Sequence, residues 1–118
     1  MKDIHSRKVL INKSELKYSG ALHENQILGK SDFDLYPARF AKISIEEDRE
    51  VFLSRLPILD KETFSISKDG KESWFLTSKI PMVNDQNILT GLVGISYDIT
   101  ERKKQSLTMS GDQTLGNV

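Results

Sequence analysis

The sequence predicts an α+β domain in which an antiparallel five-stranded sheet carries short helices on one face. The first indication is a pair of β-favouring segments, residues 73–82 and 88–97, separated by the polar run 84–87, which is typical of a hairpin. The second is an N-terminal half that reads as short helical segments stopped by glycine or proline. With 118 residues the chain is long enough for one domain with its own core.

The C-terminal hairpin is bounded by clear turn and helix signals. Gly70 accepts positive φ without steric cost, so residues 68–70 predict a tight turn. This turn would join a third strand, at 59–67, to the first strand of the hairpin. After the last strand, Asp98-Ile99-Thr100 leads into a charged helix at 101–105, with Thr100 expected as its N-cap.

The N-terminal half begins with a short strand and a capped helix. We expect the strand at residues 9–11 and the helix at 13–18. Asn12 and Glu15 form a capping-box pattern at the start of that helix, and Gly20 is a natural C-cap.

Further helical turns follow, at residues 23–28 and from Ser31, with Phe33 and Leu35 expected to point inward. The capping-box pattern of Ser44 and Glu47 then predicts two separate helices, at 38–43 and 45–55. Their expected apolar stripe consists of Phe40, Ile43, Val51, Phe52 and Leu56.

Composition limits the classes of partner and chemistry. The 17 basic and 17 acidic residues give zero net charge, so we expect no nucleic-acid partner and no direct membrane contact. The absence of cysteine excludes disulfides, thiol catalysis and zinc–thiolate sites. No apolar run reaches the length of a membrane span, and a cytoplasmic location is expected. We assign residues 1–105 to one domain and 106–118 to a polar tail or linker.

Several runs resemble a known family when they are taken in order. They are RKVLINKSELKYSG, HENQILGKSDFDLYP and EEDREV in the first half, then KDGKESWFLTSKIPMVND and GLVGISYDITERKK. Over residues 2–104 the chain resembles a PAS domain, the sensory-box family of bacterial and archaeal signalling proteins. The resemblance implies the five-stranded PAS sheet, with a first strand of which only residues 2–4 remain, so that a sheet edge is left unpaired.

The resemblance also implies which sheet face meets the helices. The inward residues, together with apolar residues opposite them, are candidates for lining a ligand pocket. They are Leu10, Ile27, Phe33, Phe40, Ser65, Phe75, Thr77, Leu92, Gly94 and Ser96. The same residues would equally form a filled core in which the hydroxyls bond to the backbone.

The opposite sheet face is expected to be the more apolar one. Its candidate dimer or partner residues are Trp74, Leu76, Val93, Ile95 and Tyr97, with Ile80 beside them. The alternative is that the exit helix or an N-terminal segment covers this face within the chain.

The residue types and motifs give little indication of a bound cofactor or of catalysis. Haem-binding relatives often use a histidine on the long helix, and residues 38–56 contain none; His5 and His23 are expected to be solvated or capping. A flavin–cysteine adduct is excluded without cysteine. Asp32, Asp34, Glu46, Glu47 and Asp48 are expected at caps or on a solvated helix face, so no metal site is predicted. No catalytic motif is present, and we expect no enzyme.

Three functions follow as hypotheses. The first is a sensory or regulatory PAS module, with a possible small-molecule ligand, covalently linked to an effector such as a sensor histidine kinase or a diguanylate cyclase. Asp98 and Thr100 would relay its state to the exit helix. The second is a ligand-free homodimerisation or scaffolding module that uses the outer sheet face. The third is a cofactor-carrying redox or gas sensor. The identity of any ligand stays open.

Overall fold

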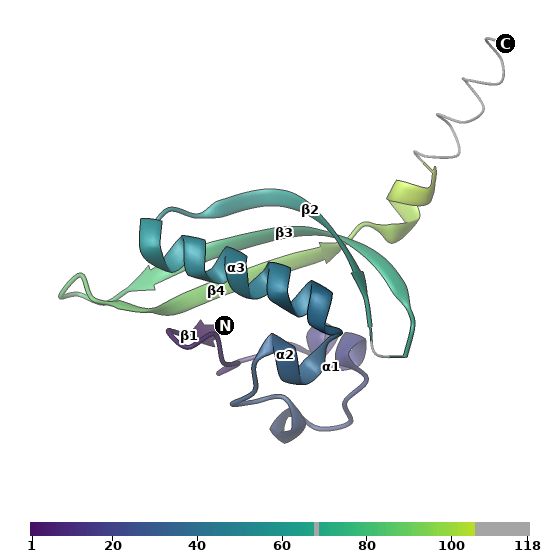
Figure 1. The fold of residues 1–118 in the computed structure, drawn as a ribbon, viewed down its shortest axis with the longest axis horizontal. Coiled ribbons are helices and arrows are strands. Elements are labelled where there is room, and N and C mark those ends of the chain that lie inside the picture. The colour runs from purple at the N-terminus through teal and green to yellow at the C-terminus, as the bar shows by residue number, and fades with distance from the viewer. Residues whose placement is uncertain (68, 106–118) are drawn as a thin grey trace, which may run out of the picture.

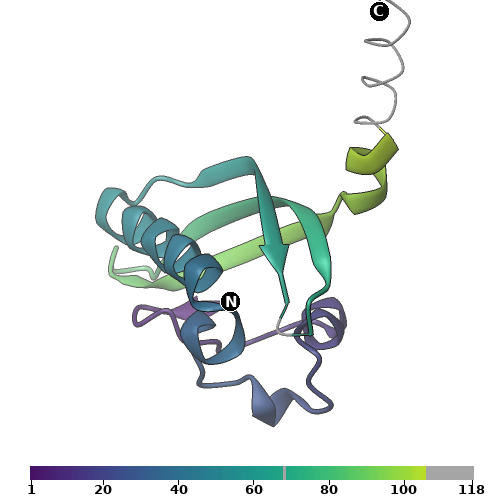
Figure 2. The ribbon, with the colours of Figure 1, turned by 45° about the vertical axis from the view of Figure 1, so that its right-hand side comes forward.

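A single antiparallel sheet organises the chain, and the helices lie on its concave side (Figures 1 and 2). The computed structural model describes residues 1–67 and 69–105. Strands β1 (Lys2–Asp3), β2 (Ile58–Ile66), β3 (Glu72–Val83) and β4 (Leu89–Asp98) lie in the order β1-β4-β3-β2. The expected α+β arrangement is therefore confirmed. The expected tail at 106–118 lies outside the described residues.

The β3–β4 hairpin is the centre of the sheet, as predicted. Phe75 faces Asp98 at one end and Val83 faces Leu89 at the other. The connecting turn is closed by the Asn84 side chain, whose Oδ1 accepts from the backbone N–H groups of Gln86 and Ile88. Short polar side chains of this kind satisfy backbone groups locally and so fix the turn.

The sheet has four strands in the described residues rather than the predicted five. The segment 9–11 does not form a strand, although the backbone of Met1 bonds to Val9 and Leu10 and an isolated bridge joins Lys2 to Lys8. Val9 and Leu10 are exposed, so little apolar burial holds this segment in extended pairing.

The edge of the sheet is only partly covered. β1 pairs with β4 at Lys2↔Leu92 and Asp3↔Gly91, and no strand among residues 1–67 and 69–105 pairs with β4 along 93–98 on that side. The expected unpaired edge is therefore present. At the covered end a Cβ on Gly91 would lie 2.1 Å from the carbonyl oxygen of Lys2, so β1 can approach only a glycine there.

The short helices begin and end where capping chemistry predicts. α1 (Lys13–Ser19) starts at Asn12, whose side chain accepts from the Glu15 N–H, and it ends at Gly20 in the left-handed conformation. The 3-10 turn η1 (Glu24–Gln26) and α2 (Asp32–Leu35) follow. Phe33 was expected to point inward, but its side chain is 52% exposed, because α2 turns Asp32 toward the interior instead.

One continuous helix, α3 (Ala38–Ser54), replaces the two helices predicted at 38–43 and 45–55. Ser44 does not cap a new helix. Its carbonyl oxygen and its hydroxyl both accept from the Lys79 ammonium of β3, at 2.9 and 3.0 Å. The side chain thus bonds across to the sheet and leaves the helical backbone uninterrupted.

The buried face of α3 is also different from the predicted stripe. Val51 is buried as predicted and Phe40 and Phe52 are half-buried, but Ile43 and Leu56 are exposed. The other buried residues of the helix are Ala41, Glu47 and Asp48. The helix therefore meets the sheet through two carboxylates as well as through small apolar side chains.

Candidate functional site

Eight charged side chains form a continuous alternating chain through the interior. We call it the charge chain. In spatial order it consists of Glu15, Lys8, Asp32, Lys2, Asp48, Lys79, Glu47 and Lys61. Each successive pair is within ion-pair distance, so four lysines alternate with four carboxylates. The members come from α1, the segment after β1, α2, β1, α3, β3 and β2, and they tie the helices to the sheet.

The centre of the charge chain is fully buried. Lys2 Nζ lies 2.6 Å from a carboxylate oxygen of Asp32 and 2.6 Å from one of Asp48. Lys79 Nζ lies 2.8 Å from Asp48 and 3.2 Å from Glu47. Asp48 is 0% exposed. Removing these groups from water is costly, and the arrangement is stable only because each charge has opposite neighbours.

These contacts set the pKa values of Lys2 and Asp32. Burial alone would lower the pKa of Lys2, but the attraction of Asp32 and Asp48 outweighs it and raises that pKa above its usual 10.5. Burial alone would raise the pKa of Asp32, but Lys2 and Lys8 hold it below its usual 3.8. Both groups are therefore ionised at neutral pH.

The sequence predicts Asp32, Glu47 and Asp48 at caps or on a solvated helix face, but all three are buried, so this prediction is wrong. Two patterns identify them in retrospect. Asp48 is seven residues after Ala41 and three before Val51, which puts it on the buried helix face. Lys79 follows Phe75 and Thr77 at a spacing of two, which puts it on the inner sheet face.

A cluster of hydroxyl groups lies on the inner sheet face beside the charge chain. Thr77 Oγ1 lies 2.9 Å from Thr63 Oγ1 and 3.3 Å from the Ser96 hydroxyl, which joins three strands. Ser65 faces Ser73 across β2 and β3. We call these residues and Tyr18 the hydroxyl cluster: Tyr18, Thr63, Ser65, Ser73, Thr77 and Ser96.

Aromatic rings cover the hydroxyl cluster from the helix side. The Tyr18 ring of α1 meets Phe75 edge-on, with ring centres 5.0 Å apart, and lies 5.9 Å from Tyr36. Burial raises the pKa of Tyr18, and nearby Ser65 opposes that rise. Burial likewise raises the pKa of Tyr36. Both phenols are therefore neutral over the physiological range.

The predicted pocket residues separate into two groups. Ile27, Thr77 and Leu92 are buried, and Phe40, Ser65 and Phe75 are half-buried. Gly94 and Ser96 lie on the inner strand face yet are exposed, so water reaches that face beside β4. Leu10 is 59% exposed, and with the exposed Phe33 it lies outside the interior.

Asp98 and Thr100, the predicted relay residues, lie where the last strand becomes the exit helix, which is helical over residues 100–105. The Thr100 hydroxyl accepts from the Trp74 N–H of β3 at 3.0 Å and donates to Asp98 Oδ1 at 2.5 Å. The same carboxylate accepts from the Thr100 N–H. The bonds from Thr100 hold the pKa of Asp98 below its usual value. Thr100 thus anchors the helix to the sheet rather than capping it.

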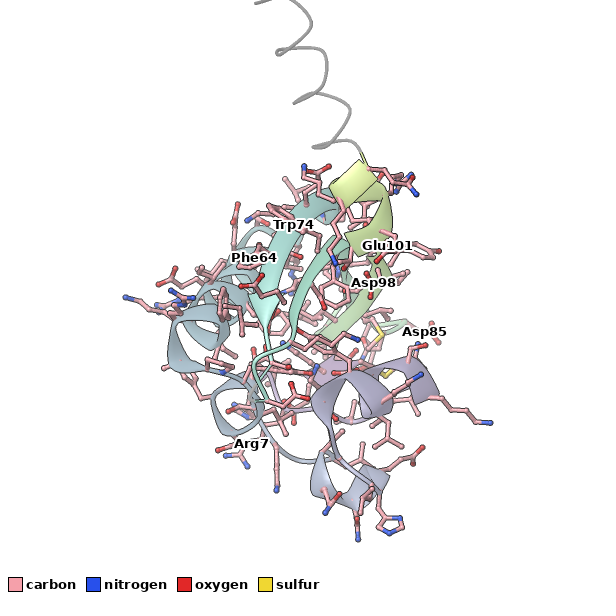
Figure 3. All side chains as sticks on the ribbon, turned by 90° about the vertical axis from the view of Figure 1, so that its right-hand side faces the viewer. Arg7, Phe64, Trp74, Asp85, Asp98 and Glu101 are labelled. Atoms are coloured by element: carbon pink, nitrogen blue, oxygen red, sulfur yellow. The ribbon has the colours of Figure 1, made fainter. Side chains whose placement is uncertain are left out.

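The exit helix also contacts the outer sheet face. Lys103 Nζ lies 4.9 Å from the centre of the Trp74 ring and 2.6 Å from the Glu62 carboxylate of β2. Figure 3 shows Phe64 and Trp74 next to one another below this helix, with Asp98 and Glu101 at its base. Three strands therefore touch the first turns of the helix.

The remaining outer-face candidates are partly open. Trp74, Leu76 and Val93 are half-buried, whereas Ile95 is 40% and Tyr97 66% exposed. A groove of about 650 Å³ runs beside the exit helix, bordered by Leu76, Tyr97 and Arg102 among others. The exit helix therefore covers Trp74 but leaves Ile95 and Tyr97 exposed. Cover within the chain accounts for the first residue, and a contact surface stays a prediction for the other two.

Neither histidine lies near the interior groups, since His5 and His23 are both exposed. Within residues 1–67 and 69–105 no group of three or more histidine, aspartate or glutamate side chains is placed to hold a metal ion. The acidic members of the charge chain are instead separated by lysines. No helix in that part of the chain is both long and apolar enough to cross a bilayer.

Comparison with known protein families gives a match to the PAS fold over residues 1–104. The chain belongs to the PAS family. Members of this family are sensory modules. A comparison with curated proteins gives no match.

Solved PAS structures share the fold at low sequence identity. The domain is similar to VqmA of Vibrio cholerae, with a TM-score of 0.76 and 22% identity over 86% of this chain and 45% of that one. It also resembles a PAS domain of Colwellia psychrerythraea (TM-score 0.68, 20% identity, 84% and 82% of the two chains). It is similar as well to the PAS domain of Bordetella pertussis BvgS, with a TM-score of 0.60 and 21% identity over 96% of this chain and 83% of that one. The chain thus spans less than half of VqmA.

The VqmA structures include one bound to DPO and one in complex with a ligand and DNA. The expectation of no nucleic-acid partner therefore finds no support from the relatives of this domain. The zero net charge on which it was based describes these 118 residues alone.

Proposed function

We propose that this PAS domain is a ligand-responsive sensory module that passes its state to a covalently linked effector domain through the exit helix. The observation that carries this proposal is the anchor at Thr100, whose hydroxyl bonds both to the Trp74 backbone of β3 and to the Asp98 carboxylate. A shift of β3 relative to β4 would change both bonds, and so the direction in which the exit helix leaves the sheet.

The interior supplies the sensing part of the proposal. The hydroxyl cluster and the rings of Tyr18 and Phe75 lie on the inner face of the same two strands that carry the anchor. VqmA, which has this fold, is a ligand-binding receptor that contacts DNA. At 22% identity the likeness concerns the fold, so DPO is a probe for this chain and not an assigned ligand. A sensor kinase, a diguanylate cyclase and a DNA-binding domain are the candidate effectors.

The test is a chimera in which the full chain is fused upstream of a histidine kinase and kinase output is measured. Thr100→Val removes the hydroxyl that anchors the helix, and Asp98→Ala removes its partner. We expect both variants to change basal output several-fold. Thr90→Val is the control, because Thr90 Oγ1 bonds to the Met82 carbonyl at the far end of the hairpin. Equal output from wild type and Thr100→Val would reject the relay.

A second candidate function is dimerisation through the outer sheet face. The specific observation is that Ile95 and Tyr97 stay exposed beside the groove although the exit helix covers Trp74. Exposed apolar side chains grouped on one sheet face are typical of a contact surface. Dimerisation is compatible with the relay, since the exit helices of two copies would leave the same face.

A further inference from the structure

Three aromatic rings form a row that joins α3 to the exit helix by way of β2, the edge strand of the sheet. We call it the aromatic row: Phe40 of α3, Phe64 of β2 and Trp74 of β3. The ring centres of Phe40 and Phe64 are 6.1 Å apart, and the rings meet at 75°. Those of Phe64 and Trp74 are 5.3 Å apart, and the two residues are register partners on neighbouring strands. Both distances lie in the range at which aromatic rings attract one another.

A cation lies at each end of the aromatic row. The Arg39 guanidinium is 4.6 Å from the centre of the Phe40 ring, and Lys103 Nζ is 4.9 Å from the centre of the Trp74 ring. Both are cation–π distances. The row therefore begins in the first turn of α3 and ends on the exit helix, and every step of it is a direct side-chain contact.

Lys103 is the residue through which the aromatic row meets the exit helix. Its ammonium also lies 2.6 Å from the Glu62 carboxylate, but half of the Glu62 side chain is exposed, and an exposed ion pair contributes little in water. The Trp74 ring is half-buried and packs on Phe64. The place of Lys103 therefore depends on the Trp74 ring, and the place of that ring depends on Phe64.

This route is separate from the anchor at Thr100. The Thr100 hydroxyl bonds to the Trp74 backbone and to the Asp98 carboxylate, so that anchor involves no ring. The aromatic row consists of side chains from α3, β2 and β3. The exit helix is thus held at residue 100 by the two central strands, and at residue 103 by side chains that lead back to α3.

We propose that Phe40, Phe64 and Trp74 are positioning residues of the relay, which carry a displacement of the first turn of α3 to Lys103 around the edge of the sheet. This inference rests on the proposed sensory function and names a second route into the same exit helix. Because α3 also carries two carboxylates of the charge chain, a change in the interior that moves α3 reaches the exit helix without passing through Thr100.

The first test is spectroscopic and uses Trp74, the single tryptophan of the chain. Its indole N–H gives one signal in the spectrum of the ¹⁵N-labelled full chain. Phe40→Leu removes a ring that contacts Phe64, and we expect it to shift the indole signal through that ring. Phe33→Leu is the matched control, because Phe33 is an exposed ring of α2 outside the aromatic row. An indole signal that stays in place in Phe40→Leu overturns the inference.

The second test measures the output of the kinase chimera. Lys103→Met and Phe64→Leu should each change basal output about two- to fivefold, the factor that corresponds to one cation–π contact. Lys103→Arg keeps a cation over the Trp74 ring and should retain wild-type output. Lys104→Met is the control, since Lys104 is an exposed neighbour on the same helix. The Lys103 variants alter an exit-helix side chain outside the core, so they decide the matter if Phe64→Leu does not fold.

A double variant separates one route from two unrelated effects. Phe40→Leu and Lys103→Met interrupt the same row, so their combination should change output no more than the stronger single variant does. Effects that multiply overturn the inference, because independent contacts add in free energy.

The aromatic row and the sensory function fail in different ways. If Thr100→Val alters output while Lys103→Met and Phe64→Leu do not, the aromatic row is not part of the relay and the sensory function stands. If none of the three alters output, the relay itself is rejected and the inference falls with it.

Discussion

Lys79 of β3 places its Nζ 2.8 Å from Oδ1 of Asp48 in α3, at a point where Asp48 is fully buried and Lys79 is nearly so. This pair joins the longest helix to the central strand. Lys79 also bonds to Ser44 one turn earlier, so a single ammonium group holds two turns of α3 against the sheet. The packing of helix on sheet thus depends on ionic contacts as well as on apolar ones.

Lys79→Met is expected to destabilise the domain by about 3–5 kcal/mol, because it leaves Asp48 and Glu47 buried with one cation fewer. Urea denaturation measures the free energy of unfolding. Lys104→Met is the control, since Lys104 and Glu101 form an exposed pair 3.9 Å apart. If the two variants unfolded at the same urea concentration, the charge chain would not support the fold.

Stability is expected to fall at both ends of the pH range. Asp32 has a lowered pKa, so its contribution is complete above about pH 3.8 and is lost as the pH falls through its lower folded value. Lys2 has a raised pKa, so its contribution is complete below about pH 10.5 and is lost as the pH rises through its higher folded value. Urea midpoints measured across both ranges test this. Asp32→Asn should flatten the acid decline, and an unchanged slope would contradict the assignment.

Gly91→Ala is expected to displace β1, since the new Cβ would lie 2.1 Å from the Lys2 carbonyl oxygen. Movement of β1 withdraws Lys2 from Asp32 and Asp48, so we expect a loss of about 2 kcal/mol or more. Amide exchange should rise in β1 and β4. Gly94→Ala is a matched control in the same strand, because its Cβ would have no atom within 4 Å. Similar exchange in the two variants would show that β1 does not depend on Gly91.

Ile95→Glu is expected to weaken any self-association of the domain through the outer sheet face. Sedimentation velocity over a range of concentrations measures the monomer–dimer equilibrium. Ile43→Glu places the same charge at a comparably exposed isoleucine on α3, on the helix side of the molecule, and should leave association unchanged. A protein that stays monomeric at high concentration, or a dimer insensitive to Ile95→Glu, would remove this second function.

The elements that sequence reasoning found are those set by local signals. Asn12, Gly20 and the polar turn beginning at Asn84 act through their own neighbours, so the bounds of α1 and of the hairpin were predictable. The turn at Asp98 and Thr100 was located correctly too, but Thr100 is not the predicted N-cap, and its bond to Trp74 spans 26 residues. Ser44 also carries a local capping pattern, but Lys79 lies 35 residues away and takes its hydrogen bonds. The long helix was missed for that reason.

The charge chain was missed because its pairs are distant in the sequence. Lys2 meets Asp48 across 46 residues, and acidic residues on a helix are more often solvated than buried. Only the spacing of Lys79 along its strand and of Asp48 along its helix indicates that these two side chains face the interior. The sequence gives no sign that the Ser73 hydroxyl lacks a partner among the described residues, because a serine that bonds to the backbone and one that does not are the same letter in a sequence.

The partly covered margin of β4 has a practical consequence for work on the isolated domain. Residues 93–97 contain neither a charged residue nor a proline, the usual means by which proteins prevent another strand from adding to an edge. Backbone groups along this stretch are free to template extended segments from other molecules. We therefore expect aggregation of concentrated preparations to begin by strand addition at this margin.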